Sequence, residues 1–251
     1  IGRQNQVPDF IVCHITGGSF TSALNTILNA ANQVSYHFVV GRDGAIIQAV
    51  NIEDTAWANG TTNSGDNRDN RHSTIPAVRE RRRNANQFTV SIGFADSSGG
   101  ELSAAQLSAG VDLIVHIKNE VSRIYGFHIP ISRSNIIGHH EINPLTRANC
   151  PGPRFPWDEI IRKLSMRKGG GDNMPRYNTI GEVPSGFARD AVQRWVADGH
   201  LRGSGVDPST GEVRGLDLTM DMIRGMILGE RITEARISKL EDVVASLGVK
   251  V

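Results

Sequence analysis

The chain has 251 residues, enough for one ample domain or two modest ones. Its 27 lysine and arginine residues balance 26 aspartate and glutamate residues, so the formal net charge is only +1. This balance gives no reason to expect nucleic acid as the main partner, and no apolar run has the length needed to span a bilayer. We therefore expect neither a nucleic-acid partner nor a membrane span.

The first predicted element is a strand over residues 10–16, "FIVCHIT". Its side chains alternate between two faces, and one face carries His14 and Thr16 at the carboxyl end. A Gly-Gly-Ser turn and a helix over about residues 21–32 follow. The turn leaves His14 at the edge of the predicted sheet, where its side chain can face a cleft.

A hairpin is predicted next. "VSYHFVV" and "AIIQAV" have strand character, and the Asp43-Gly44 pair between them is a typical hairpin turn. The polar stretch over residues 60–87 is too long for an ordinary connection. We expect it to be a surface excursion in which the arginine run at residues 79–83 forms a solvated face.

The elements up to residue 164 are further strands and long helices. "FTVSIGFA" and "SNIIGHHE" predict strands, and residues 155–164 predict a helix with proline in its first turn. Between them, residues 103–126 have the apolar spacing of a helix, with Ser103 as its N-cap. The apolar positions are Leu107, Val111, Ile114, Val115, Ile117 and Val121. This order predicts an α/β fold with a central mixed β-sheet flanked by helices.

A glycine-rich break, "MRKGGGDNMPR", separates two regions of periodic pattern. We expect a first domain over residues 1–165, a flexible linker over 166–176 and a small, mainly helical module over 177–251.

The module is expected to contain a helix with Val192, Trp195 and Val196 on one face, and a second helix capped by Thr219. Apolar residues between 237 and 247 then step by three and four, as in a coiled coil. About two heptads are too few to be stable alone, so this C-terminal helix is expected to need a partner. A homo-oligomer would supply one.

Cys150 lies in "TRANCPGPRFPW", where prolines exclude a regular helix or central strand. The stiff backbone there would hold the sulfur in a fixed place. The other cysteine, Cys13, lies in the apolar first strand, which favours a buried free thiol. A Cys13–Cys150 disulfide is the less favoured alternative, because a scaffold of this size does not need one.

Histidines are the candidate partners of Cys150 in a metal site. Zinc prefers imidazole and thiolate ligands, and a catalytic zinc keeps its fourth position open. His14 ends the first strand and His139 ends a later one, so these two and Cys150 would form such a site. His140 is an alternative to His139, and spacing alone does not decide between them.

Six stretches between Phe10 and Leu164 occur in a recognisable order: "FIVCHITGG", "VSYHFVVGRDGAIIQAV", "TAWANG", "SIGF", "IIGHHEINP" and "NCPGPRFPW". Together they resemble the zinc-dependent N-acetylmuramoyl-L-alanine amidase family, which includes phage lysins, bacterial autolysins and peptidoglycan recognition proteins. The resemblance implies a central mixed sheet with flanking helices and a Zn²⁺ cofactor in a groove. It also implies hydrolysis of the amide that joins N-acetylmuramic acid to L-alanine in peptidoglycan.

The resemblance assigns the metal ligands residue by residue. His14 matches the family's first ligand, His139 the second, and Cys150 the third, where relatives have Cys or Asp. The prolines around Cys150 would then clamp a thiolate ligand, which is not free to act as a nucleophile. Glu141 is expected to hydrogen-bond a ligating histidine rather than to act as a base.

Two positions differ from the family pattern. Many relatives have a glutamate where this chain has Ala95, and a lysine where it has Ala148. Tyr36 matches the tyrosine that relatives place beside the metal, and Arg147 is one residue away from the missing lysine. We expect Tyr36 to donate to the oxyanion or to help move the proton, and Arg147 to reach the place of the lysine.

Three further residues of the matching stretches are expected to contact substrate: Thr16, Trp57 and Asn59. For Trp57, ordinary packing is an open alternative. His37 should point away from Tyr36 and have a structural role. As an alternative to a solvated face, the arginine run at residues 79–83 could contact stem-peptide carboxylates or anionic wall polymers.

The segment from Tyr177 to about Ile232 resembles, more faintly, wall-associated repeats of the S-layer-homology type, through "WVADGHLRG". We expect a wall-targeting or oligomerising module, with a packing appendage as the alternative. The start "IGRQNQVPDF" lacks the pattern of a signal peptide, although a trimmed start would look the same. The expected location is secreted or cell wall, or the host cytoplasm before release for a phage endolysin.

Two other functions remain open at this point. A recognition protein would hold peptidoglycan without cleaving it, and a cysteine hydrolase would use Cys150 with a histidine. The presence of a third ligand disfavours the first, and the effect of a chelator would separate the second from a zinc enzyme.

Overall fold

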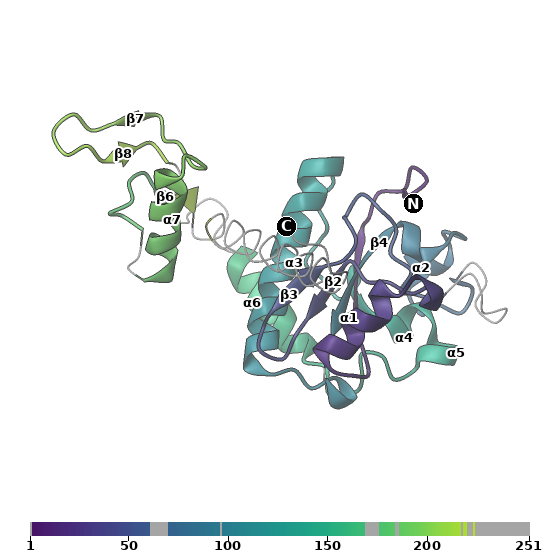
Figure 1. Ribbon diagram of the computed structural model, residues 1–251. Helices are drawn as coiled ribbons and strands as arrows, with labels where there is room; N and C mark the ends of the chain where they lie inside the picture. Colours follow the sequence, from purple (N-terminus) through teal and green to yellow (C-terminus); the bar gives the residue numbers. More distant parts are fainter. Residues whose placement is uncertain are drawn as a thin grey trace. The chain divides into compact units, whose positions relative to one another are not determined.

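The computed structural model describes residues 2–60, 70–95, 97–168, 176–183, 186–216, 218–219 and 223 (Figure 1). The chain forms two compact units, one up to Ser165 and one that begins at Met166. The predicted coiled-coil segment at residues 237–247 and the glycines at 169–171 lie outside the described residues. Within them, no helix combines the length and apolar character needed to cross a membrane.

The first unit is built on a five-stranded sheet, as predicted. Its strands are β1 (Phe10–Ile15), β2 (Phe38–Val40), β3 (Ile46–Gln48), β4 (Thr89–Phe94) and β5 (Ile136–Gly138), in the order β3-β2-β4-β1-β5. The β2-β4, β4-β1 and β1-β5 pairs are parallel, and only β3 runs antiparallel to its neighbour. Its connection to β2 turns at Gly44, which has a φ of 85°. The sheet is therefore mixed, and its carboxyl edge gathers the ends of four parallel strands.

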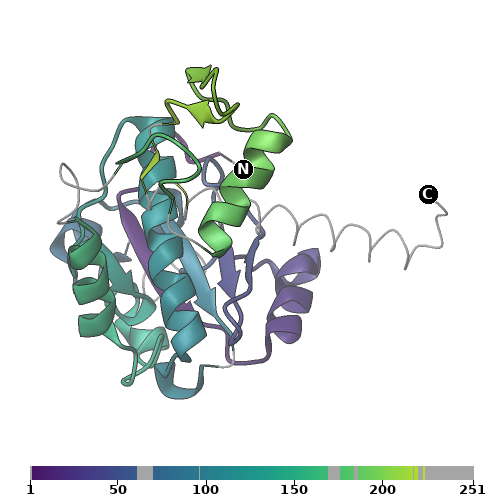
Figure 2. The same ribbon diagram turned by 90° about the vertical axis from the view of Figure 1, so that its left-hand side faces the viewer.

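One face of the sheet is covered by helix α3 (Ala104–Tyr125), which lies along the strands in Figure 2. Phe38 of β2 meets His116 of α3 edge-on, with ring centroids 6.3 Å apart. A side chain at Gly110 would come within 2.8 Å of Phe94, so a glycine lets the helix approach the sheet closely. Phe155, just before helix α6 (Trp157–Lys168), packs on the same Phe94 at 5.4 Å. The predicted Ser103 cap of α3 is confirmed, because Ser103 and Gln106 bond each other's backbone amides.

Shorter helices cover the opposite face and leave its carboxyl end open. Helix α1 (Phe20–Leu28) packs Leu24 against Val39, while α2 (Pro76–Arg79) packs Val78 against Phe10 and Val12. Two short helices, α4 (His139–Ile142) and α5 (Pro144–Arg147), follow β5 directly. The predicted strand therefore ends one residue before His139.

The arginine run differs in part from the expected solvated face. Arg82 and Arg83 are exposed, but Arg81 makes a bidentate ion pair with Asp9 at 2.8 and 2.6 Å. Its guanidinium also lies 4.2 Å from the centroid of the Phe88 ring. Arg81 therefore ties the polar excursion to the sheet, because a guanidinium can stack on an aromatic ring while it pairs with a carboxylate.

His37 is buried beneath the chain's first residues, in agreement with a structural role. Its Nδ1 accepts the amide of Ser91 at 3.0 Å, and its Nε2 lies 2.8 Å from Nη2 of Arg3. Burial, followed by the charge of Arg3, lowers the pKa of His37 to about 3. The imidazole is therefore neutral at physiological pH and is part of the core.

The second unit is described only in part, and the expected mainly helical module over residues 177–251 stays a prediction, because residues 224–251 lie outside the described residues. Its described residues include helix α7 (Phe187–Ala197) and two small antiparallel sheets that pair β6 (Arg176–Tyr177) with β9 (Leu218–Thr219) and β7 (Gly205–Val206) with β8 (Val213–Arg214). Thr219 pairs with Arg176, and residues 220–222, where the helix that it was expected to cap would begin, lie outside the described residues. Val192 and Trp195 are buried in this unit's core with Leu218, so the predicted apolar face of α7 is confirmed.

Candidate metal centre

Two histidines meet because the strands that carry them are neighbours. His14 lies in β1, and His139 is the first residue after β5. The strands pair in parallel with Cys13 opposite Gly138, which brings the two following residues together at the carboxyl edge of the sheet. Parallel pairing thus joins residues that are 125 positions apart in the chain.

Cys150 completes the cluster from the loop after α5. The Nδ1 atoms of His14 and His139 lie 3.1 Å apart, and the Cys150 sulfur lies 3.9 Å from Nδ1 of His14. All three ligand atoms lie within 4.8 Å of one another. The structure therefore brings the three predicted ligands together, and both cysteines are free thiols rather than the alternative disulfide.

The spacing of these atoms fits a tetrahedral zinc site. Zinc bonds of about 2.05 Å to nitrogen and about 2.3 Å to sulfur give N···N and N···S edges of about 3.3 and about 3.6 Å. The corresponding distances of 3.1 and 3.9 Å are each within a few tenths of an ångström of these edges. Three protein ligands also leave a fourth position open.

The protonation states of the histidines suit metal binding. Burial, together with the neighbouring histidine and Arg147, lowers the pKa of His14 well below its ordinary value. Burial likewise lowers the pKa of His139 to about 4. Burial raises the pKa of Cys150, against smaller opposing effects from the Ile15 amide and the charge of Arg147. At neutral pH both imidazoles are neutral and ready to bind, whereas the thiol must lose a proton when it binds a metal.

A backbone carbonyl orients His139. The Nε2 atom of His139 lies 2.9 Å from the carbonyl oxygen of Asn59, to which it donates its proton. This leaves the Nδ1 lone pair for the metal. The backbone amide of Asn59 donates in turn to Asn86, and its side chain donates to Thr89. Asn59 was expected to contact substrate, but it is fully buried and positions a ligand instead.

Neither Glu141 nor His140 takes the place considered for it in the sequence. Glu141 was expected to bond a ligating histidine, yet its carboxylate accepts the amide of Gly138 and pairs with Arg133, each at 2.7 Å. It therefore fixes the start of α4. His140 lies outside the ligand cluster, because its ring points to the carbonyl of Cys150.

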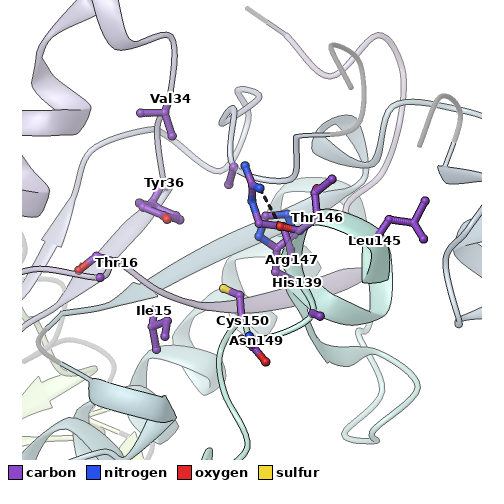
Figure 3. Close-up of a pocket in the computed structure, with 13 residues that line it drawn as sticks. Ile15, Thr16, Val34, Tyr36, His139, Leu145, Thr146, Arg147, Asn149 and Cys150 are labelled. Atoms are coloured by element: carbon purple, nitrogen blue, oxygen red, sulfur yellow. Dashed lines mark hydrogen bonds between the residues drawn. The ribbon is translucent and has the colours of Figure 1, made fainter. Parts of the chain in front are cut away.

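Two of the three ligands, His139 and Cys150, line a cavity with a volume of about 530 Å³ (Figure 3), while His14 is fully buried beside them. Thr16, Tyr36 and Arg147, all expected at the site, line this cavity with His139 and Cys150. No carboxylate occurs among the described residues that line it.

A family model described as N-acetylmuramoyl-L-alanine amidase matches residues 4–153, more than half of the chain and a span that includes all three ligands. The chain belongs to this amidase family. The His14, His139 and Cys150 cluster is typical of the family's zinc site.

Individual relatives are distant. The 1,6-anhydro-N-acetylmuramyl-L-alanine amidase AmpD of Haemophilus influenzae is 26% identical over 132 residues, which cover 53% of this chain and 59% of that protein. The chain thus spans about three fifths of the length of this curated relative. Among solved structures, the PlyG catalytic domain is 21% identical, with 68% of this chain and 87% of that chain covered and a TM-score of 0.45. The amidase AmiD of E. coli, in complex with an anhydro-N-acetylmuramic acid peptide, is 18% identical, with 89% of each chain covered and a TM-score of 0.44.

Tyr36 lies beside the first ligand, His14. Its ring centroid is 5.2 Å from that of His14. Burial, followed by the charge of Cys150, raises the pKa of the Tyr36 hydroxyl above its ordinary value. The ring rests on Gly93, where a side chain would come within 3.1 Å of Thr16 and 3.2 Å of Tyr36. A glycine in β4 thus makes room for a neutral phenol at the metal centre.

Arg147 is the exposed last residue of α5 and lines the cavity with Thr146 and His139, as Figure 3 shows. Its Nη1 atom donates to the carbonyl of Thr146 at 2.9 Å, and its charge lowers the pKa values of His14, His139 and Cys150. The positive charge therefore acts on the centre although the side chain is exposed.

The remaining candidates lie apart from the cavity lining. Ala95, at the position where many relatives have glutamate, is fully buried against α1, and the neighbouring Asp96 lies outside the described residues. Trp57 does not line the cavity, but it is 38% exposed next to Ala58, which does.

Proposed function

We propose that this chain hydrolyses the amide bond between N-acetylmuramic acid and L-alanine in peptidoglycan. The observation that carries the proposal is the convergence of His14, His139 and Cys150 beside a cavity that the last two line, inside the span that matches the amidase family. The name of the AmpD relative, an amidase of an N-acetylmuramyl-L-alanine bond, supports the same reaction.

The site residues have defined tasks in this reaction. His14, His139 and Cys150 would hold the zinc ion, with the Asn59 carbonyl keeping Nδ1 of His139 unprotonated. When bound, zinc supplies an activated water and a Lewis acid for the scissile carbonyl. The ligands thereby set the place where the amide must lie.

Tyr36 and Arg147 would stabilise the charge that develops on the substrate. Because the pKa of Tyr36 is raised, its Oη keeps the proton and donates a hydrogen bond to the oxyanion on the substrate carbonyl. The guanidinium of Arg147 carries a positive charge and lines the same cavity. With alanine at position 95, these two side chains take over the electrostatic role that a carboxylate and a lysine share in many relatives.

Substrate contacts are assigned to Thr16 and Trp57. The Thr16 hydroxyl donates to the carbonyl of Gly18 at 3.0 Å, so its lone pairs can accept a peptide amide of the stem. The partly exposed Trp57 offers an apolar ring face next to the cavity, suited to a sugar or a lactyl group. The second unit would hold the wall, and residues 237–247 would supply contacts for a homo-oligomer. These assignments describe a lysin of the cell wall: an autolysin, or an endolysin made in the host cytoplasm.

Purified walls test the reaction. The chain with zinc should release free amino termini of alanine without releasing new reducing ends, and a chelator should abolish the release until zinc is restored. His14→Ala and Cys150→Ser should bind zinc more weakly and lose activity. Tyr36→Phe should keep zinc but lower kcat about 100-fold, the effect typical of a lost oxyanion donor.

The alternatives give different results in the same assay. A peptidoglycan recognition protein would bind walls but release no amino termini. A cysteine hydrolase would stay active in the chelator and lose activity with a thiol reagent. Either result would refute the zinc amidase.

A further inference from the structure

One carbonyl oxygen in the cluster accepts two hydrogen bonds from a single residue. The backbone amide of His140 donates to the carbonyl of Cys150 at 2.9 Å, and Nδ1 of the same residue lies 2.9 Å from the same oxygen. A carbonyl oxygen only accepts, so Nδ1 must carry the proton. His140 therefore donates two hydrogen bonds to the backbone carbonyl of Cys150, the third ligand.

The backbone donor is available because of its position in α4. His140 is the second residue of this helix, where an amide has no partner inside the helix. The Cys150 carbonyl supplies that partner. The loop that carries the thiol is thus attached to the same helix start that carries His139.

The imidazole of His140 has little freedom to leave this position. A side chain at Gly138 would come within 2.6 Å of both Cε1 and Nδ1 of His140 and within 2.8 Å of Pro151. The ring and the proline therefore pack directly on the Gly138 backbone. Glu141 fixes that backbone in turn, by accepting the Gly138 amide at 2.7 Å.

The thiol of Cys150 needs such support because its loop lies outside regular secondary structure. The amide of Cys150 donates to the carbonyl of Arg147 at 3.0 Å, but Pro151 has no amide donor. Rotation of the Cys150 peptide would turn the sulfur away from the two Nδ1 atoms. The two bonds from His140 oppose that rotation.

We propose that His140 is a positioning residue of the metal centre: its two N–H groups fix the Cys150 peptide so that the sulfur faces His14 and His139. The inference rests on the proposed zinc site. Loss of an outer partner of a metal ligand lowers metal affinity by about 10- to 100-fold. Loss of the Nδ1 donor should have an effect of this size.

Substitution of His140 by residues with amide side chains distinguishes the effect of the Nδ1 donor from the effect of the volume of the ring. In His140→Asn, the side-chain nitrogen can occupy nearly the same place as Nδ1, whereas in His140→Gln it lies one bond further out. His140→Ala removes the donor entirely. His128→Ala is the matched control, because His128 is exposed.

The measurement is the zinc dissociation constant of each purified full-length variant, from competition with a chromophoric chelator. We expect His140→Asn and His128→Ala to match the wild type, and His140→Ala and His140→Gln to bind zinc at least about tenfold more weakly. Cobalt-loaded protein gives a second readout, because the absorption from the sulfur-to-cobalt bond should weaken in the same two variants. Unfolding of the zinc-free variants shows whether they fold.

The inference is wrong if His140→Ala, or a well-folded His140→Gln, binds zinc as tightly as the wild type. It is also wrong if His140→Asn binds as weakly as His140→Gln. A wild type that binds no zinc would refute the proposed function as well. A wild type that binds zinc and cleaves walls beside an unaffected His140→Ala would refute only the role of His140.

Discussion

Zinc binding should release one more proton from the wild type than from Cys150→Ser. The reason lies in the zinc-free pKa values: burial leaves His139 neutral above about pH 4 and keeps His14 neutral as well, while it holds the Cys150 thiol protonated. The thiol alone must therefore ionise when the metal enters. Any proton lost by zinc-bound water is common to both proteins and cancels in the comparison.

The magnitude follows from this single proton. Between about pH 5 and pH 8, the zinc affinity of the wild type should rise about tenfold per pH unit relative to Cys150→Ser, which is about 1.4 kcal/mol per unit. The sign is fixed because raising the pH favours the thiolate, the only form that binds. Below about pH 4, protonation of His139 should weaken zinc binding in both proteins.

Calorimetric titration of the zinc-free proteins, in buffers with different ionisation enthalpies, measures the proton count directly. The slope of the observed enthalpy against the buffer enthalpy gives the number of protons released. An equal count for the two proteins would refute the reasoning, since Cys150 would then be no ligand or would already be a thiolate. His128→Ala should behave as the wild type.

Three further predictions concern activity and stability. Gly93→Ala should lower kcat on walls several-fold and leave zinc affinity unchanged, because the new methyl group would displace the Tyr36 ring. Arg81→Ala should lower the free energy of unfolding by about 1–2 kcal/mol, from the loss of the bidentate pair and the ring contact, as measured by urea titration. For the zinc-free protein, His37 has a pKa of about 3 when folded and about 6.5 when unfolded, so its contribution is complete above pH 6.5. As the pH falls from 6.5 towards 3, the wild type should lose about 1.4 kcal/mol per unit more than His37→Gln.

Each of these predictions has a result that would contradict it. Normal kcat in Gly93→Ala would mean that the Tyr36 ring is free to move. Arg83→Ala, at an exposed neighbouring position, should be neutral, and an equal loss there would assign the Arg81 effect to charge alone. Parallel pH profiles for the wild type and His37→Gln would show that His37 is not held neutral.

The sheet and the metal ligands could both be predicted from the sequence, but for different reasons. The apolar run at residues 10–16 predicted β1, because a strand buried on both faces leaves a short apolar run, and the Asp43-Gly44 turn between two strand-like stretches predicted the hairpin. The spacing of His14, His139 and Cys150 could not select the ligands by itself, since parallel pairing joins positions far apart in the chain. The resemblance of six stretches to one family supplied the selection between His139 and His140.

The predictions that the structure corrects concern hydrogen-bond contacts, which no pattern of residue types in the sequence reveals. The carbonyl of Asn59 orients His139, and a backbone acceptor has no residue-type signature, so Asn59 was assigned to substrate instead. Glu141 was expected to take that role, but its short reach back to Gly138 satisfies the start of α4.

The pairing of β1 with β5 also sets the order in which the centre can come into being. As the chain leaves the ribosome, His14 emerges with the first strand, but its neighbour in the sheet is not made until residues 136–138 and the thiol loop follows later still. A nascent chain of about half the full length therefore contains only the first of the three metal ligands and cannot form the metal site. The ion can be captured only at a late stage of assembly, and an unfinished or truncated product is expected to be harmless to the wall of the cell that makes it.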